Sequence, residues 1–205
     1  MDPLTDRFPT LTPRQLAQYD AMEDLYREWN ARINVISRKD MDNLRTHHIL
    51  HSLAIALLAD FPAGSTVLDV GTGGGFPGIP LAVRFPESQF TLCDSIGKKI
   101  KVAQAVADGL ELTNVTCVNA RAETLPGRFD YVVSRAVTDL VTFYPWVKGK
   151  FSKAVFYLKG GDLDEEITAC CRRWKLDPGK FLQTPISNWL DDHWFEGKKI
   201  VTILQ

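Results

Sequence analysis

The first sixty residues carry an apolar pattern of helical period. The segment T-P-R-Q at residues 12–15 is a capping box with proline at the first helical position. Apolar side chains then recur at spacings of three and four, at Leu16, Tyr19, Met22, Leu25, Tyr26 and Trp29. This stripe predicts a helix over 13–32. A second helix is expected from about 41 to 59, where Pro62, Gly64 and Ser65 follow.

From residue 66 the pattern changes to short apolar runs that alternate with amphipathic segments. The runs cover 66–71, 89–94, 115–119, 129–135 and 153–160, and the amphipathic segments cover 78–85, 97–110, 138–149 and 163–174. Such alternation predicts βαβ units and a parallel sheet covered on both faces. The run at 198–205 predicts one more strand, antiparallel to an extended segment before it. We therefore expect an α/β domain over 63–205 that follows an N-terminal helical appendage over 1–62.

Composition narrows the class of protein. The chain has 205 residues, of which 45% are hydrophobic and 24% charged, and its formal net charge is −1. No apolar run approaches the ~20 residues that a membrane span needs, and the acidic N-terminus lacks the apolar core of a secretory signal. The four cysteines form no C-x-x-C pair, which argues against zinc or a disulfide framework. We expect a cytoplasmic protein without a metal and without a membrane partner.

Four glycines fall within residues 71–75, directly after the first apolar run. Glycine at such a place indicates a sharp backbone turn that a ligand can approach closely. Asp69, Gly71, Gly73 and Gly75 give the Asp-x-Gly-x-Gly-x-Gly pattern of S-adenosylmethionine sites, whereas residues 73–78 give the Gly-x-Gly-x-x-Gly pattern of dinucleotide sites. A structural turn without a ligand is the third interpretation.

Three features favour S-adenosylmethionine over a dinucleotide. About 140 residues follow position 66, too few for two mononucleotide-binding halves and a substrate domain. Phe76 and Pro77 crowd the helix start that a pyrophosphate would need. Asp69 precedes the glycines, where its carboxylate can orient the loop near the cationic end of S-adenosylmethionine. Asp94 ends the next predicted strand, and an acid there accepts hydrogen bonds from the ribose of either cofactor.

A family resemblance then adds to this interpretation. The chain resembles the bacterial small-subunit ribosomal RNA guanine-N7 methyltransferases, also called the glucose-inhibited division protein B family. The resemblance rests on WNARIN (29–34), HHILHS (47–52), DVGTGGGFPGIPLA (69–82), LCDSIGKKIKV (92–102), NARAETL (119–125), FDYVVSRAV (129–137) and YLKGG (157–161). It implies a class I S-adenosylmethionine-dependent methyltransferase fold, Rossmann-like, with a mostly parallel seven-stranded sheet. It also implies transfer of a methyl group to N7 of a guanine in 16S ribosomal RNA.

The resemblance also implies which residues contact the cofactor. They are Gly71, Phe76, Asp94, Ser95, Ala122, Glu123 and Arg135, to which the loop pattern adds Asp69, Gly73 and Gly75. The chain departs from the family at three places. It has Asn34-Val35-Ile36 where Asn-Leu-Thr is frequent, His51 where Asp is frequent, and Gly74 where proline is frequent.

Guanine N7 carries a free lone pair, so its methylation needs placement and no general base. The chain has Ser134-Arg135-Ala136-Val137 where enzymes that methylate exocyclic amines carry Asn/Asp-Pro-Pro-Tyr/Phe. Cys93 and Cys117 lie in predicted strands and do not suit a cytosine-C5 nucleophile. Arg135 is a candidate positioning residue that holds the cofactor carboxylate or an RNA phosphate. Its alternative role is a surface ion pair with Asp139.

Candidate RNA contacts are cationic clusters, for which solvated surface is the alternative. They comprise Arg38, Lys39, Arg45, His48, Lys98 and Lys99. His51 shares a helix face with His47 or His48 at metal-compatible spacing, but no third ligand is evident. Since a net charge of −1 poorly suits naked RNA, we expect the small ribosomal subunit or a late precursor as partner, and no DNA. The rival functions are a methyltransferase of small molecules or proteins and a non-catalytic nucleotide-binding module.

Overall fold

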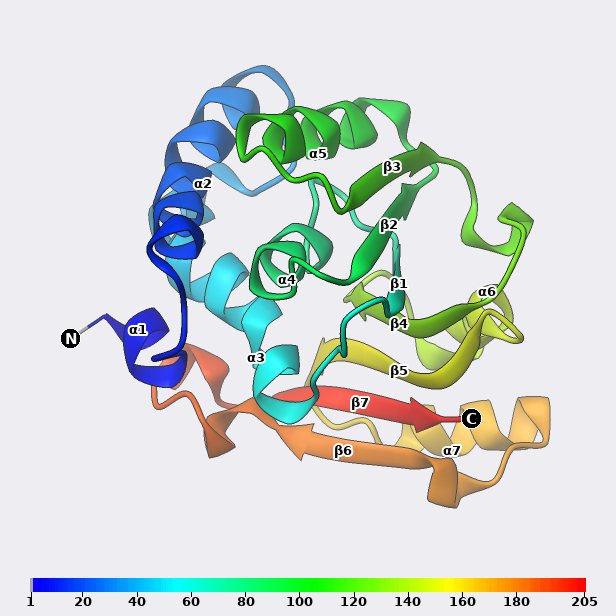
Figure 1. Ribbon diagram of the computed structural model, residues 1–205. Helices are drawn as coiled ribbons and strands as arrows, with labels where there is room; N and C mark the ends of the chain where they lie inside the picture. The colour runs from blue at the N-terminus through cyan, green and yellow to red at the C-terminus, as the bar shows by residue number, and fades with distance from the viewer. Residues whose placement is uncertain (1) are drawn as a thin grey trace.

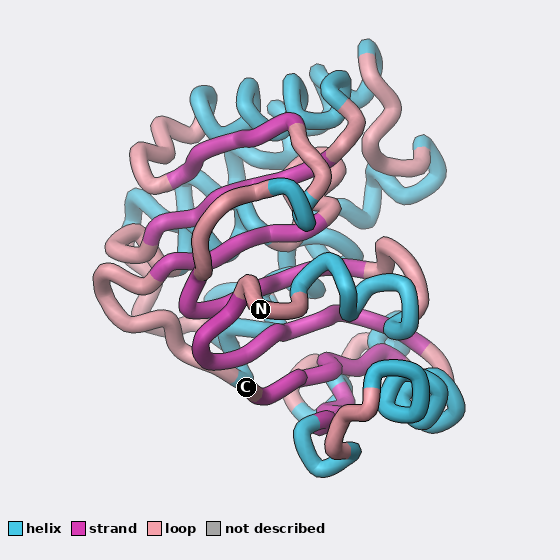
Figure 2. The backbone as a smooth tube through the Cα atoms, turned by 90° about the vertical axis from the view of Figure 1, so that its right-hand side faces the viewer, coloured by secondary structure: helices cyan, strands magenta, loops and turns pink. Residues whose placement is uncertain are grey.

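Seven strands form one twisted sheet in the order β3-β2-β1-β4-β5-β7-β6, which reads from top to bottom in Figure 1. The computed structural model describes residues 2–205. The strands are β1 (Thr66–Val70), β2 (Gln89–Asp94), β3 (Val115–Asn119), β4 (Phe129–Arg135), β5 (Phe151–Gly160), β6 (Phe181–Pro185) and β7 (Lys198–Leu204). The first five are parallel, and β7 pairs antiparallel with β5 and β6 on its two sides. Figure 2 shows the strands side by side. The predicted mostly parallel class I sheet is confirmed.

Helices cover both faces of the sheet (Figure 1). The α-helices are α1 (Pro3–Arg7), α2 (Pro13–Arg32), α3 (His51–Leu58), α4 (Gly78–Arg84), α5 (Gly97–Gly109), α6 (Leu140–Val147) and α7 (Asp164–Trp174). The other helical segments are η1 (Arg38–Asn43), η2 (Leu44–Leu50), η3 (Ala122–Thr124), η4 (Pro178–Lys180), η5 (Ile186–Asn188) and η6 (His193–Phe195). In the figure α2, α3 and α4 lie on one side of the sheet, and α6 and α7 lie on the other.

Helix α2 has the predicted bounds and the predicted capping box. The Thr12 side chain accepts from the Gln15 N–H, and the Gln15 side chain accepts from the Thr12 N–H. The Tyr19 hydroxyl donates to the Pro80 carbonyl at 3.0 Å, and the Tyr26 hydroxyl donates to the Gly74 carbonyl at 2.9 Å. Both rings are fully buried. Helix α2 therefore holds the glycine-rich loop and the helix after it by hydrogen bonds from two tyrosines.

The predicted helix over 41–59 is helical but not one regular α-helix. The chain passes from a 3₁₀ segment, η1, through a π-helix, η2, into the α-helix α3. The Ser52 hydroxyl donates to the His48 carbonyl at 2.6 Å within this stretch. A π-helix is rare and frequently occurs at functional sites. Hydrophobic periodicity is too coarse to distinguish these three helical types.

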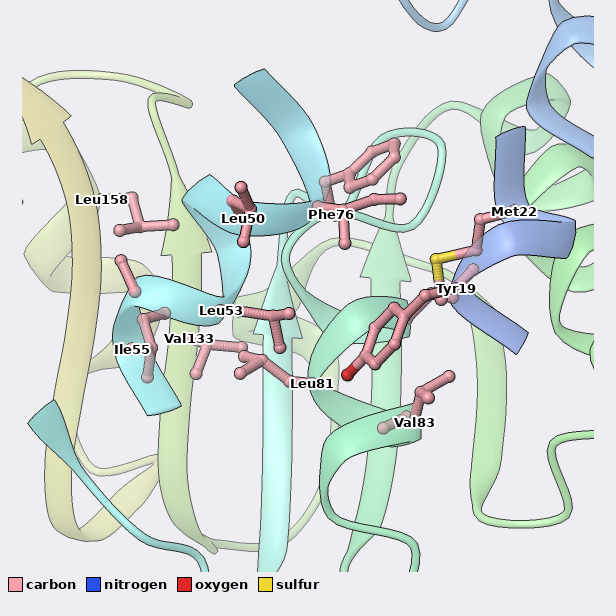
Figure 3. Packing of buried hydrophobic residues seen from close by; sticks show 14 of the residues in the cluster. Tyr19, Met22, Leu50, Leu53, Ile55, Phe76, Leu81, Val83, Val133 and Leu158 are labelled. Carbon is pink, nitrogen blue, oxygen red and sulfur yellow. The ribbon is translucent and has the colours of Figure 1, made fainter. Parts of the chain in front are cut away.

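Apolar side chains pack in one cluster on each face of the sheet. Figure 3 shows Phe76 of the glycine-rich loop in the same cluster as Tyr19 and Met22 of α2 and Leu53 of α3. Cys170 and Cys171 of α7 are buried in the opposite cluster. The division into an appendage over 1–62 and a domain over 63–205 stays a prediction. In residues 2–205, no helix has the length and apolar character needed to cross a membrane.

Candidate functional site

The strand order reverses between β1 and β4, which makes this a topological switch point. Ligands of parallel sheets bind beyond the carboxyl ends of the strands at such a point. The glycine-rich loop, residues 71–78, lies there. Gly71 has φ +69°, and a Cβ at this position would collide with the Val137 side chain. Gly75 has φ +114°, and a Cβ there would collide with Ile79. Only glycine fits at both positions without strain, so the loop backbone stays open to a ligand.

Asp69 lies beneath this loop and is fully buried. Its Oδ2 accepts from the Thr72 hydroxyl at 2.6 Å and from the Gly78 N–H at 2.8 Å. Its Oδ1 has no hydrogen-bond partner among the residues that the structure describes. Burial raises the pKa of this carboxyl to about 7, against the opposing effect of the two hydrogen bonds. Asp69 thus fixes both ends of the loop from below.

Asp94 ends β2 and is held by backbone groups on two sides. Its Oδ2 accepts from the Gly73 N–H at 3.0 Å, and its Oδ1 accepts from the Ile96 N–H at 2.8 Å. The Asn119 side chain donates to the Asp94 carbonyl at 2.8 Å. Each carboxylate oxygen keeps a second lone pair for a ligand. The carboxylate is thereby fixed beside the loop.

The first cavity, of about 320 Å³, opens over the carboxyl ends of β1 and β2. Its lining is Val70, Gly71, Cys93, Asp94, Ser95, Ile96, Lys99, Ala120, Arg121, Ala122, Glu123, Val137 and Trp146. The structure therefore brings together five of the predicted cofactor residues, which are Gly71, Asp94, Ser95, Ala122 and Glu123. Their roles stay predictions. The volume is in the range of ligand pockets, and the fixed Asp94 carboxylate beside an open backbone suits the hydroxyl groups of an adenosine. The lining fits S-adenosylmethionine.

Phe76 and Arg135 lie together outside the lining of the first cavity. Phe76 is buried and stacks on Tyr26 with 4.6 Å between ring centroids. The Arg135 guanidinium carbon is 4.9 Å from the Phe76 ring centroid. Burial lowers the pKa of Arg135 to about 10, although the charge of Asp69 acts in the opposite direction. Asp139, the alternative partner of Arg135, instead caps α6 and accepts from the Thr142 N–H at 2.9 Å.

Arg135 continues into a chain of polar contacts with η1 and η2. One guanidinium N–H donates to His48 Nδ1 at 3.0 Å, and another donates to the His47 carbonyl at 3.4 Å. Since His48 Nδ1 accepts, its Nε2–H donates to Asp40 Oδ2, at 2.7 Å. Burial and the charge of Arg135 lower the pKa of His48 to about 4. His48 is therefore neutral at pH 7 and acts as a hydrogen-bond acceptor for Arg135.

Asp40 and His51 complete this cluster. The other oxygen of Asp40 is 2.5 Å from His47 Nδ1. The His51 ring makes edge contacts with Trp194 and Phe195, and its Nε2 has no partner among the described side chains. Burial, and to a smaller extent the positive charge of Arg135, lowers the pKa of His51 well below its ordinary value. In residues 2–205, no three histidine, cysteine or acidic side chains are placed to hold a metal ion together.

The second cavity, of about 260 Å³, lies over the carboxyl ends of β4 and β5 and the start of β7. Its lining is Asp40, His47, His48, His51, Arg135, Ala136, Leu158, Lys159, Gly160, Trp194 and Lys198. Two predicted site residues, Arg135 and His48, are brought together here. The sequence did not predict Asp40, Trp194 and Lys198, because Asp40 is about 150 residues from the other two and the three belong to no common motif.

The remaining candidate RNA contacts are dispersed. Arg38, Lys39 and Lys98 are exposed, whereas Lys99 lines the first cavity. The guanidinium of Arg45 is surrounded by the carboxylates of Asp2, Asp20 and Glu23. Its hydrogen bond holds the pKa of Asp2 below the ordinary value. Arg45 is thus already paired with acids, and we do not include it in the RNA contact below.

Comparison with known proteins gives one consistent result. A family model described as rRNA small subunit methyltransferase G matches residues 14–191. "Ribosomal RNA small subunit methyltransferase G" of Flavobacterium psychrophilum is 51% identical over 99% of this chain and 97% of its own length. The protein of the same name from Bacteroides thetaiotaomicron is 45% identical over 98% of each chain.

Solved structures share the fold at low identity. Magnesium protoporphyrin IX methyltransferase from Synechocystis PCC 6803, solved with bound S-adenosylmethionine, is similar with a TM-score of 0.62. It is 15% identical, and the match covers 96% of this chain and 99% of that one. Fibrillarin in complex with Nop5p has a TM-score of 0.54 at 10% identity, over 74% and 79% of the two chains. These likenesses establish the fold.

Proposed function

The chain belongs to the rRNA small subunit methyltransferase G family, and from this we propose that it transfers a methyl group from S-adenosylmethionine to N7 of a guanine in small-subunit (16S) ribosomal RNA. The observation that carries the proposal is the 51% identity to a relative of that name over 99% of the chain. The first cavity supports it, because the fixed Asp94 carboxylate and the open glycine backbone fit the methyl donor.

The residues of the site agree with a reaction at an unprotonated ring nitrogen. S-adenosylmethionine supplies an electrophilic methyl group on its sulfonium. Since guanine N7 offers its lone pair directly, the protein needs only to place the two reactants, which is worth about 7–11 kcal/mol. The Asp94 carboxylate is occupied by two backbone N–H groups and serves binding. Burial raises the pKa of Cys93 to about 11, so its thiol is not a nucleophile at neutral pH.

The physical state of the substrate is part of the proposal. We infer that the enzyme acts in the cytoplasm on the assembled small subunit or a late precursor. A net charge of −1 supports this, because a protein that binds naked RNA commonly neutralises several phosphates. Assembly presents the target loop in one conformation, which lowers the ordering cost of binding. Arg38, Lys39 and Lys98, all exposed, supply a short electrostatic contact.

Labelled methyl transfer tests the reaction. The purified protein with labelled S-adenosylmethionine should methylate small subunits from cells that lack it, and N7-methylguanosine should appear in their 16S RNA. Label in protein or in small molecules would favour another substrate class, and no transfer at all would favour a non-catalytic binding module. For the substrate state, intact subunits, protein-stripped RNA and a short hairpin are compared at physiological salt. Equal kcat/KM on hairpin and subunit would contradict the inference on assembly.

A further inference from the structure

Two cations line the second cavity without a carboxylate partner. Arg135 donates only to a histidine ring and a backbone carbonyl. The side chain of Lys198 makes no hydrogen bond or ion pair with any residue in the described range 2–205, and its Nζ lies 3.9 Å from the Trp194 ring centroid. A third cation, Lys159, differs because its Nζ is 2.5 Å from Glu166 Oε1. The cavity therefore holds two cations that no carboxylate contacts directly, although the charge of Asp69 acts on Arg135 from a distance.

The acid that belongs to the same cavity does not neutralise them directly. Both carboxylate oxygens of Asp40 are occupied, one by His47 and one by His48. Its charge acts on Lys198 and Arg135 only from a distance. Partial burial lowers the pKa of Lys198 as it lowers that of Arg135. Removing cations from water without a partner is costly, and an anion between them would offset that cost.

Both cations are also held in place. The neutral ring of His48 accepts from Arg135 while Phe76 packs against the guanidinium. Lys198 is held by the Trp194 ring, which in turn stacks on His47 at 4.0 Å between centroids. A cation–aromatic contact of this kind restrains an ammonium group without neutralising it. The arrangement is pre-organised for an anionic ligand.

We propose that the second cavity is an anion subsite in which Arg135 and Lys198 bind a phosphate of the acceptor RNA strand. This inference rests on the proposed function, which supplies the RNA. The first cavity lies over β1 and β2, and the second lies over β4, β5 and β7 along the same edge of the sheet. A phosphate bound in the second cavity therefore anchors the acceptor nucleotide beside the methyl donor. The carboxylate of S-adenosylmethionine is the other anion that this chemistry accepts, and the family resemblance implies that Arg135 contacts the cofactor. The test therefore acts on Lys198 and separates the two anions.

The test compares Lys198→Gln with a matched control, Lys153→Gln. Lys153 is also a lysine on the sheet, but it lies near the start of β5, away from both cavities, beside Asp130. Dissociation constants for small subunits are measured across a series of monovalent salt concentrations with S-adenosylhomocysteine bound. We expect Lys198→Gln to weaken subunit binding about tenfold. The slope of the logarithm of the association constant against the logarithm of the salt concentration should become less steep by about 0.7 to 1. Lys198→Arg should restore the slope, and Lys153→Gln should match the wild type.

A second measurement distinguishes an RNA phosphate from the cofactor carboxylate as the anion that binds in this cavity. The dissociation constant of S-adenosylhomocysteine, which has the same carboxylate, should change less than twofold in Lys198→Gln. An unchanged salt slope in this variant, or weakened binding of S-adenosylhomocysteine in place of RNA, would overturn the inference. Thermal unfolding verifies that the variant is folded. If the wild type methylates no 16S RNA, the proposed function fails, whereas wild-type transfer with an unaffected Lys198→Gln refutes only the phosphate subsite.

Discussion

The two cavities lie along one edge of the sheet and differ in chemistry. In the first, the acids Asp94 and Glu123 lie beside an open glycine backbone, where we propose that the ribose hydroxyls and the sulfonium of the cofactor bind. In the second, Arg135 and Lys198 lie among neutral or acid-paired histidines. Hydroxyl donors and a cationic donor group need acceptors, whereas a polyanionic RNA strand needs cations. Under the proposed assignment, one sheet edge binds two ligands of opposite charge in separate cavities.

Phe76 connects the two cavities. It belongs to the glycine-rich loop that borders the first cavity, and it packs against Arg135 of the second. If the division of tasks is correct, substitutions in the first cavity should affect the cofactor and leave RNA binding unchanged. Substitutions among the cations should do the reverse. The predictions below test this division, from the largest expected effect to the smallest.

Gly71→Val should strongly weaken cofactor binding. The positive φ of Gly71 disfavours valine, and the new side chain collides with Val137 in the lining of the first cavity. A strain of order 1–3 kcal/mol plus the lost space predicts at least about 100-fold weaker S-adenosylhomocysteine binding by calorimetry. Gly127→Asn is the control, because Gly127 also has a positive φ but no neighbouring atom within 4 Å. Wild-type affinity in folded Gly71→Val would refute the first cavity as the cofactor site.

Asp94→Asn should weaken the cofactor about 10- to 100-fold. The amide keeps the shape but places an N–H₂ group against the Gly73 or Ile96 N–H, so one charged hydrogen bond of about 1.5–3 kcal/mol is lost. The dissociation constant of the small subunit should change less than twofold in the same variant. Calorimetry and subunit binding measure the two quantities separately. Equal losses in both would mean that the cavities do not divide the two ligands.

His48→Gln should flatten the acid dependence of stability. The pKa of His48 falls from 6.5 unfolded to about 4 folded, so the unfolded chain binds more protons between these values. The stability from the neutral ring is therefore present above pH 6.5 and lost as pH falls toward 4. From pH 7 to pH 5 this loss is about 2 kcal/mol of unfolding free energy, which urea titrations measure.

The matched control for this prediction is His193→Gln, whose ring is 88% exposed and should leave the pH dependence unchanged. Asp69 contributes with the opposite sign. Its folded pKa is raised from 3.8 to about 7, so the stability from its neutral form is present below 3.8 and lost as pH rises through 7. This contribution is common to all three proteins and cancels in the comparison. If His48→Gln loses as much stability at pH 5 as the wild type, His48 is not buried neutral.

Arg45→Gln should have the smallest effect on RNA. Three carboxylates already surround this guanidinium. Its removal should therefore hardly change the number of counterions that the RNA releases when the protein binds. We expect a subunit dissociation constant within twofold of the wild type and an unchanged salt slope. Unfolding free energy should fall by roughly 1 kcal/mol, the scale of partly exposed ion pairs. A salt slope reduced as much as in Lys198→Gln would remove the distinction between paired and unpaired cations.

Most of the fold was predictable from sequence because its determinants are local. Alternating apolar runs located β1 to β5 and β7, and the capping box located the first residue of α2. The first cavity was largely predictable too, since it is built from loops that directly follow strands. The 3₁₀ and π turns of η1 and η2 were not predicted, and β6 was expected only as an extended segment of unspecified bounds antiparallel to the run at 198–205. Their geometry depends on packing that periodicity does not express.

The second cavity was not predictable for a different reason. His48, Arg135 and Lys198 are separated by about 60 to 90 residues each, and none belongs to a spaced motif shared with the others. Only the sheet order, with β7 beside β5, brings Lys198 to the end of β4 and β5. The neutral state of His48 also depends on burial, which a single sequence does not reveal.

The position of β7 has a consequence for how the chain is made. This strand follows β6 in sequence but inserts between β5 and β6. During translation the free edge of β5 therefore stays open until residues 198–204 have been synthesised. A nascent chain stopped before residue 198 exposes an unpaired strand edge, a recognised cause of aggregation. Such a chain also lacks Lys198 and with it the proposed phosphate subsite, so RNA binding at this subsite requires that β7 has been synthesised.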